Sequence, residues 1–316
     1  MRILSTITLF LLAALTANAQ KMVPLGDTTY QHKIDSLLQI ADQEFFYGGD
    51  FIKAHNNYRM AYMLGSTDAA YMLGRCYAEC LVDEYTEWDK ALRLWTQAAQ
   101  AGHAESAYKI AECLTLGNGY QQDLEKAAEW YELASRLGSP EGAFMLGTMY
   151  FTGTGVAQDM QKTEEYWTKA ADQGLVKAQA QLGLEYYLGK NLKRNMLKAV
   201  DYMTKAADQG DGNSAFYAGL FKEKAMGCVE DPVSAAYYYM VAADKGIPEA
   251  QLNLARMYYD GRGVDQNKKR AAYWYKEAAN QNVAEAQYAL GQMYLNGEGV
   301  EKNLGEAAKW IRKSGK

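Results

Sequence analysis

Residues 140–175 read PEGAFMLGTMYFTGTGVAQDMQKTEEYWTKAADQGL, and this stretch of 36 residues recurs along the chain with the same markers. A glycine stands at five positions spaced 36 residues apart, and Asn282 takes the next position in that series. Self-similarity at a fixed period of roughly 20–50 residues is the sequence signature of a repeat architecture. The chain is therefore predicted to be a tandem array of short structural units. The five glycines are Gly102, Gly138, Gly174, Gly210 and Gly246.

Each unit is predicted to form two helices joined by a glycine-rich turn. In residues 248–260, Leu254 and Tyr258 lie at the spacing of one face of a helix. The glycines in residues 260–264 favour a turn, because glycine tolerates the positive φ that such a turn requires. Asn267 is predicted to cap the second helix by accepting hydrogen bonds from free N–H groups in its first turn. The large aromatic residues are predicted to fill the core between helices: Tyr150, Tyr186, Tyr258, Tyr294, Trp130, Trp167 and Trp274.

The same residues resemble a known family. Residues 146–156, followed by Asp159 and by residues 166–174, are similar to the Sel-1-like repeat, a relative of the tetratricopeptide repeat. The resemblance divides the chain into a tetratricopeptide-like unit at residues 34–67 and seven Sel-1-like repeats at residues 68–316. It implies an all-α fold: a right-handed α-solenoid of about eight helix-turn-helix repeats with a period of 36 residues.

The first 19 residues are predicted to be a Sec-type signal peptide. One early positive charge is followed by an apolar stretch from Ile3 to Leu15 and by the ending Ala17-Asn18-Ala19. The apolar stretch is shorter than the roughly 20 residues that a membrane-spanning helix needs, and an uncleaved anchor is the alternative. Cleavage after Ala19 would leave residues 20–33 as a leader. We therefore expect a periplasmic or secreted protein with no membrane span after cleavage.

Composition excludes two broad classes of protein. With 49% hydrophobic and 22% charged residues, the chain is too apolar for intrinsic disorder. Its net charge of −5 also argues against nucleic acid as a partner, because neutralising phosphates requires a basic surface.

Four cysteines are present, and their spacing is not that of a metal site. Cys76 and Cys80 are four residues apart, and no histidine pair lies near them, so no metal site is predicted. An exported protein can form disulfides, and a bond between Cys80 and Cys113 is the pairing we expect. The alternative is that all four cysteines, the fourth being Cys228, are buried thiols that pack as small hydrophobic groups.

No catalytic residue and no cofactor are predicted. The Gly-x-Gly sequences recur once per repeat without a following Gly-Lys-Ser/Thr, so they are interpreted as turns and not as phosphate-binding loops. The histidines His32, His55 and His103 are isolated, and no Gly-x-Ser-x-Gly sequence occurs. Some cysteine-rich exported members of the resembled family were described as β-lactamases, which leaves an exported hydrolase as an alternative. The regular cysteine pair of those proteins is absent here.

The resemblance also implies where a partner would bind. In tetratricopeptide solenoids, the first helix of each pair lines a concave groove, and by analogy its fifth and twelfth residues face that groove. In this chain most of these residues are aromatic, which suits an extended peptide or a helix of a partner. The alternative is that the rings pack between the first helices. The predicted groove residues are Tyr71, Tyr108, Phe144, Phe151, Tyr187, Phe216, Tyr259 and Tyr288, with Arg75, Arg256 and Gln292 as polar contacts.

The sequence as a whole predicts a non-enzymatic scaffold or adaptor that binds a partner protein or peptide along such a groove. A glycan or peptidoglycan binder is a further alternative, since stacked tyrosine rings fit the faces of sugars as well as they fit peptides.

Overall fold

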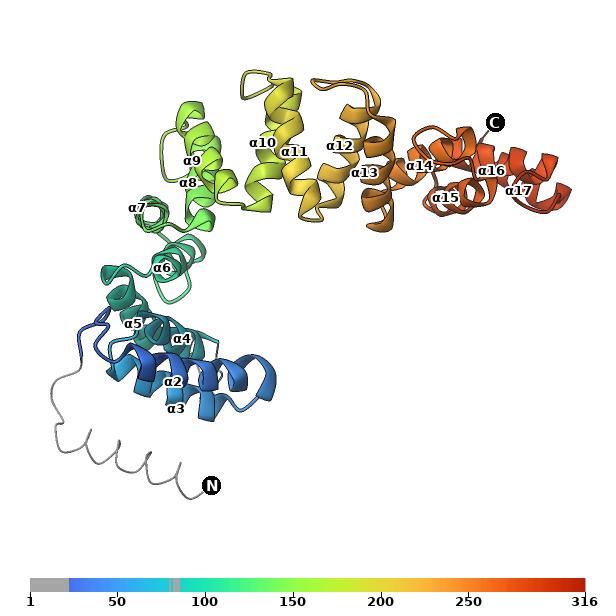
Figure 1. The fold of residues 1–316 in the computed structure, drawn as a ribbon. Coiled ribbons are helices and arrows are strands. Elements are labelled where there is room, and N and C mark those ends of the chain that lie inside the picture. Colours follow the sequence, from blue (N-terminus) through green and yellow to red (C-terminus); the bar gives the residue numbers. More distant parts are fainter. Residues whose placement is uncertain (1–22, 80, 82–85, 316) are drawn as a thin grey trace. The chain divides into compact units, whose positions relative to one another are not determined.

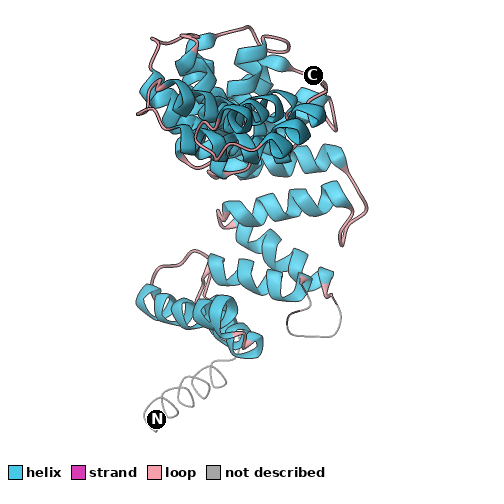
Figure 2. Ribbon diagram, turned by 90° about the vertical axis from the view of Figure 1, so that its right-hand side faces the viewer, coloured by secondary structure: helices cyan, strands magenta, loops and turns pink. Residues whose placement is uncertain are grey.

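The computed structural model describes residues 23–79, 81 and 86–315. Within these residues the chain forms helices joined by turns, and it contains no β-strand (Figures 1 and 2). The helices occur in successive pairs with a 36-residue period, so the predicted all-α repeat fold is confirmed. The predicted signal peptide, residues 1–19, lies outside the described residues.

The chain divides into two compact units, residues 1–158 and residues 159–316. In the first unit each helix packs against the next one in the sequence, so that the helices form a continuous stack. Its elements are α2 (Gln31–Gln43), the π-helical turn η1 (Glu44–Gly48), α3 (Phe51–Met63), α4 (Thr67–Ala78), α5 (Trp88–Gln100), α6 (Ala104–Leu116), α7 (Leu124–Arg136) and α8 (Pro140–Thr152).

The second unit is built in the same way, from consecutive helices that pack side by side. Its elements are α9 (Met160–Asp172), α10 (Val176–Leu188), α11 (Met196–Asp208), α12 (Gly212–Glu223), α13 (Pro232–Asp244), α14 (Pro248–Asp260), α15 (Lys268–Asn280), α16 (Ala284–Asn296) and α17 (Leu304–Lys313).

The first helical pair begins slightly earlier than the sequence predicts. Helix α2 begins at Gln31, inside the stretch 20–33 that we expected to be a leader. Part of that stretch also contacts the first pair, since the Gly26 N–H donates a hydrogen bond to the Gly65 carbonyl oxygen at 2.8 Å.

The helix ends use the predicted polar residues and glycines. The Asn267 side chain accepts a hydrogen bond from the Arg270 N–H at 3.0 Å and so caps α15. Asn282, which continues the glycine series, has the same left-handed backbone as the glycines, with φ of 65°. Asparagine tolerates this conformation better than other residues with a side chain, so the repeat geometry continues through this turn.

Aromatic and small side chains share the core. Trp167 and Tyr186 are each 2% exposed and Tyr258 is 7% exposed, as the sequence predicts. Four other predicted core rings are half-buried, and two of them, Trp274 and Tyr294, pack against the buried core of the second unit. The other two are Trp130 and Tyr150.

Candidate functional site

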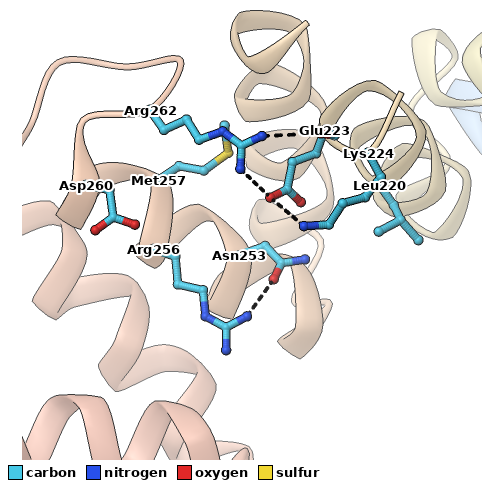
Figure 3. A pocket seen from close by; sticks show the side chains of 8 residues that line it. All are labelled: Leu220, Glu223, Lys224, Asn253, Arg256, Met257, Asp260 and Arg262. Carbon is cyan, nitrogen blue, oxygen red and sulfur yellow. Dashed lines mark hydrogen bonds and ion pairs between the residues drawn. The ribbon is translucent and has the colours of Figure 1, made fainter. Parts of the chain in front are cut away.

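The first helix of each pair, which we call the A helix, carries the predicted groove residues. The A helices that carry them are α4, α6 and α8 in the first unit and α10, α12, α14 and α16 in the second. A polar pocket of about 320 Å³ lies on α12 and α14, and we call it the α12–α14 pocket (Figure 3). It is lined by Leu220, Glu223, Lys224, Asn253, Arg256, Met257, Asp260 and Arg262.

Glu223 lies at the end of α12 and organises one wall of this pocket. Its carboxylate accepts a hydrogen bond from the Tyr239 hydroxyl at 2.8 Å and pairs with Arg262 at 3.1 Å and Lys224 at 3.2 Å. Burial of the Tyr239 ring, followed by this hydrogen bond, raises the Tyr239 pKa well above its ordinary value. Arg262 also contacts Glu230 at 2.8 Å, and this contact raises the pKa of its guanidinium. The wall is therefore a fixed network of alternating charges.

Arg256 forms the opposite wall of the pocket from α14 (Figure 3). Its guanidinium donates to Glu285 at 2.6 Å and to the Asn253 side-chain oxygen at 3.5 Å. The side chain remains 48% exposed, so its other N–H groups are accessible from solution. A guanidinium held in this way presents oriented donors to an incoming carboxylate or carbonyl oxygen.

An aromatic cluster lies next to the pocket on the same helix. The Tyr187 ring of α10 lies 5.6 Å from Tyr217 and 5.1 Å from Phe221, measured between ring centroids. Phe216 lies 5.4 Å from Tyr217. Phe221 is fully buried, whereas the other three rings are half-buried. The three half-buried rings form a partly exposed apolar surface that bridges α10 and α12, with Phe221 beneath it.

The cluster and the pocket are joined by one face of α12. Tyr217, Leu220 and Lys224 are spaced three and four residues apart, so they lie in one row along the helix. We call this row the α12 strip. It begins in the aromatic cluster and ends in the α12–α14 pocket.

The predicted groove residues of the first unit are half-buried: Tyr71, Tyr108, Phe144 and Phe151. The Tyr71 ring lies 5.1 Å from His103, and the Tyr108 ring lies 5.7 Å from Tyr131 of the following helix. Arg75 pairs with Glu79 one turn along its own helix, at 2.8 Å.

In the second unit the structure brings together Tyr187 and Phe216 in the aromatic cluster and places Arg256 in the neighbouring pocket. Tyr259 lies outside that pocket's lining, and its hydroxyl donates to Glu298. On α16, Tyr288 is 36% exposed and Gln292 is half-buried. The Tyr187 ring packs against α12, the next A helix, and is only half-buried. It therefore agrees with both interpretations of these positions, packing between A helices and exposure on their surface.

Sequence reasoning missed part of the site. It considered the fifth and twelfth residues of each A helix and three polar ninth residues, whereas Tyr217 and Asn253 are sixth residues and Lys224 is a thirteenth. The helical spacing of three and four residues was a usable signal, because it relates these positions to Leu220 and Arg256. Arg262 follows α14, and no helical pattern indicates that its side chain turns back toward α12.

The predicted disulfide partner Cys80 lies outside the described residues. Cys76 and Cys113 are both buried, and burial raises the pKa of each thiol to about 11. A thiol with so high a pKa is a weak nucleophile at neutral pH, so both side chains behave as apolar groups.

The described part of the chain holds no group of three or more His, Cys, Asp or Glu side chains placed to bind a metal ion. None of its helices is both long and apolar enough to cross a bilayer.

Comparison with known proteins shows that other proteins share this repeat. The model of the Sel1 repeat matches eight segments: residues 67–79, 89–103, 104–139, 140–175, 176–211, 213–247, 248–283 and 284–316.

Two solved structures have a similar fold. One is a protective antigen of uropathogenic Escherichia coli with an SLR fold, 28% identical, with a TM-score of 0.69 over 83% of this chain and 56% of that one. The other is a Sel1 repeat protein from Oxalobacter formigenes, also 28% identical, with a TM-score of 0.53 over 78% of this chain and 96% of that one.

Among curated proteins, chitin synthase regulatory factor 2 of Schizosaccharomyces pombe is 30% identical over 86 residues. The match covers 27% of this chain and 16% of that protein. The chain therefore corresponds to a small part of this curated relative.

Proposed function

Because the chain belongs to the Sel1 repeat family, we propose that it is a non-enzymatic scaffold that binds an extended segment of a partner protein. The α12 strip carries this proposal. It connects a partly exposed aromatic surface to a pocket with oriented charged groups, on the A helices that form the binding face in related helical repeats.

The chemistry of the strip indicates what kind of segment it would bind. The rings of Tyr187 and Tyr217 offer flat apolar contact area, which suits an aliphatic or aromatic side chain of the partner. The α12–α14 pocket, with Arg256 on one wall and Glu223 on the other, suits a polar or charged side chain a few residues away. Tyrosine and arginine are the residue types enriched among side chains that dominate binding energy.

The side chains of the pocket are held in place by their neighbours. Glu223 is held by Tyr239, Arg262 and Lys224, and Arg256 is held by Glu285. Groups held in such pairs are suited to positioning a ligand, and the proposed role as a scaffold requires no bond-making step.

We also propose that the chain is exported to a periplasm or to the outside of the cell. This part rests on the apolar N-terminal stretch and the Ala17-Asn18-Ala19 ending alone.

A quantitative capture experiment tests the binding proposal. The protein is immobilised, and proteins retained from a native extract are quantified for the wild type and for Tyr217→Ala and Arg256→Glu. Each variant has a matched control on a different surface: Tyr237→Ala on α13, where the ring is 51% exposed, and Arg59→Glu on α3.

A partner that binds along the α12 strip and into the α12–α14 pocket should bind Tyr217→Ala and Arg256→Glu at least tenfold more weakly, which corresponds to about 1.4 kcal/mol, and should bind both controls normally. Equal retention by these two variants and the controls would show that this surface is not the binding site.

A further inference from the structure

A buried tyrosine recurs in this chain at a fixed place in the repeat. In the second unit, Tyr186 of α10 is 2% exposed and stacks on Tyr202 of α11, with centroids 6.2 Å apart and planes 9° from parallel. The ammonium group of Lys198 lies 4.6 Å from the ring centroid and 2.8 Å from the hydroxyl. Tyr258 also has a cation beside it, since Arg270 lies 5.4 Å from its ring centroid and contacts its hydroxyl at 3.1 Å.

In the α6–α7 repeat this ring is missing, but the stacking ring and the cation beside it have counterparts. Leu114 occupies the position that is 72 residues before Tyr186. Trp130 and Lys126 stand at the positions of Tyr202 and Lys198, again 72 residues earlier. The stacking surface and the cation that enclose a tyrosine ring elsewhere are therefore retained here without the ring.

A pocket of about 500 Å³ opens at this place. Leu114, Trp130, Lys126 and Tyr120 are among the residues that line it. The volume is within the range of roughly 300–1,000 Å³ that is usual for small-ligand sites. Tyr120 adds an aromatic wall that is 36% exposed, at a position where other repeats carry aliphatic residues such as Leu192. We call this site the Leu114 pocket.

We propose that the Leu114 pocket binds the phenol side chain of a tyrosine supplied by a partner protein. The Trp130 ring would stack on the incoming ring as Tyr202 stacks on Tyr186. Lys126 would donate to its hydroxyl as Lys198 does in α11. Lys126 now pairs with Asp123 at 2.7 Å, but its side chain is 65% exposed and is free to turn toward a ligand.

The occupant is inferred from the chain's own repeats. Where the tyrosine is present, as at Tyr186, the repeat fills the equivalent space with a phenol ring and pairs its hydroxyl with a cation. A sugar would also stack on Trp130, but the ring that other repeats of this chain place at the equivalent position is a phenol. The site is separate from the α12 strip, so the two proposals are tested independently.

A titration with p-cresol, which is the side chain of tyrosine as a free molecule, tests the proposal. Binding to the full chain is followed by ligand-observed NMR. We expect saturable binding in the millimolar range, with magnetisation transfer from Trp130 and Tyr120. N-acetyl-tyrosinamide should displace p-cresol, whereas N-acetyl-alaninamide should not.

Leu114→Tyr should weaken p-cresol binding at least tenfold, because it restores the missing ring and fills the pocket. The matched control is Leu116→Tyr, the same substitution two residues away at a 63% exposed position, which should leave binding unchanged. Circular dichroism reports whether each variant is folded. The reverse substitution, Tyr186→Leu, removes a ring from the equivalent position and should create a second p-cresol site in the second unit.

Three outcomes would overturn the proposal. They are the absence of saturable p-cresol binding to the wild type, unchanged binding in folded Leu114→Tyr, and saturable binding of N-acetylglucosamine in place of p-cresol. The last result would assign the pocket to a sugar.

Discussion

Gly219 lies in the middle of α12, where the lack of a side chain lets the ring of Tyr239 approach the helix. A Cβ atom added at this position would lie 2.8 Å from the ring, which is closer than two carbon atoms can approach without a shift. Glycine inside a helix costs roughly 1 kcal/mol relative to alanine, so its presence here is explained by packing. The Tyr239 hydroxyl donates a hydrogen bond to Glu223, so the packing of Tyr239 on Gly219 also positions one wall of the α12–α14 pocket.

We therefore predict that Gly219→Ala lowers the free energy of unfolding by about 1–3 kcal/mol despite the better helix propensity of alanine. The measurement is urea denaturation followed by circular dichroism. Gly305→Ala in α17, where the residue is exposed, serves as the control and should leave the free energy of unfolding unchanged or raise it by up to about 1 kcal/mol, because alanine has the better helix propensity. Equal effects of the two substitutions would contradict the close packing of α12 and α13.

The buried tyrosines predict a loss of stability at alkaline pH. Burial raises the pKa of Tyr275 to about 12, and burial followed by the hydrogen bond to Glu164 does the same for Tyr186. In the unfolded chain a tyrosine loses its proton near pH 10, so between pH 10 and 12 the folded state binds more protons than the unfolded state. Stability is thus complete below pH 10 and falls as the pH rises toward 12.

The check is the melting temperature measured from pH 8 to pH 12, together with the phenolate absorbance of the folded protein. We expect the buried tyrosines to ionise only as the protein unfolds. Ionisation of every tyrosine near pH 10 without loss of helical signal would contradict their burial.

At the scale of helices, the cap residues determine where each second helix begins. Asn267 accepts a hydrogen bond from the Arg270 N–H at 3.0 Å, one of the first-turn groups that has no partner within the helix. Asn267→Ala should lower the free energy of unfolding by about 1 kcal/mol, within a range of roughly 0.5–2 kcal/mol. Asp265→Ala, at an exposed position two residues earlier, should have almost no effect. A comparable loss in both variants, measured by urea denaturation, would argue against the cap.

The helices could be predicted closely because their signals are local. Residues 248–260 were expected to form one helix, and α14 has the same bounds. Apolar spacing, the cap and the glycine turn all lie within one repeat, and they are repeated along the chain. The predicted aromatic positions were likewise placed on the A helices, and Tyr187 and Phe216 do come together in one cluster.

The α12–α14 pocket could not be predicted in the same way, because it depends on contacts between repeats. Arg262 reaches back from the turn after α14 to Glu223 and Glu230, which are 39 and 32 residues earlier. Such contacts depend on how neighbouring helix pairs stack. The Leu114 pocket has a weaker but readable signal, namely a leucine at a position where four other repeats have tyrosine.

At the scale of the whole molecule, each of the two units is a stack in which a helix contacts mainly its neighbours in the sequence, as expected for a repeat protein. The α12 strip lies in the second unit and the Leu114 pocket in the first, so the two proposed sites belong to separate units.

The proposed export concerns the whole chain and has its own test. Expression in a bacterium followed by fractionation should release a protein whose N-terminal sequence begins at Gln20, because cleavage after Ala19 leaves Gln20 first. Replacement of the small residue in Ala19→Leu should block this cleavage. An uncleaved chain that starts at Met1 and stays with the membrane fraction would support the alternative of an anchor.

The central claim is that the α12 strip is the surface that holds a partner protein. Its most direct test is site-specific photo-crosslinking in the living cell, with a photoreactive amino acid at position 217 or, as the matched control, at position 237. Tyr217 belongs to the strip, whereas Tyr237 is an exposed tyrosine on α13. We predict a discrete crosslinked product from position 217 that is absent from position 237. A product from position 237 alone, or from neither position in a folded protein, would contradict the claim.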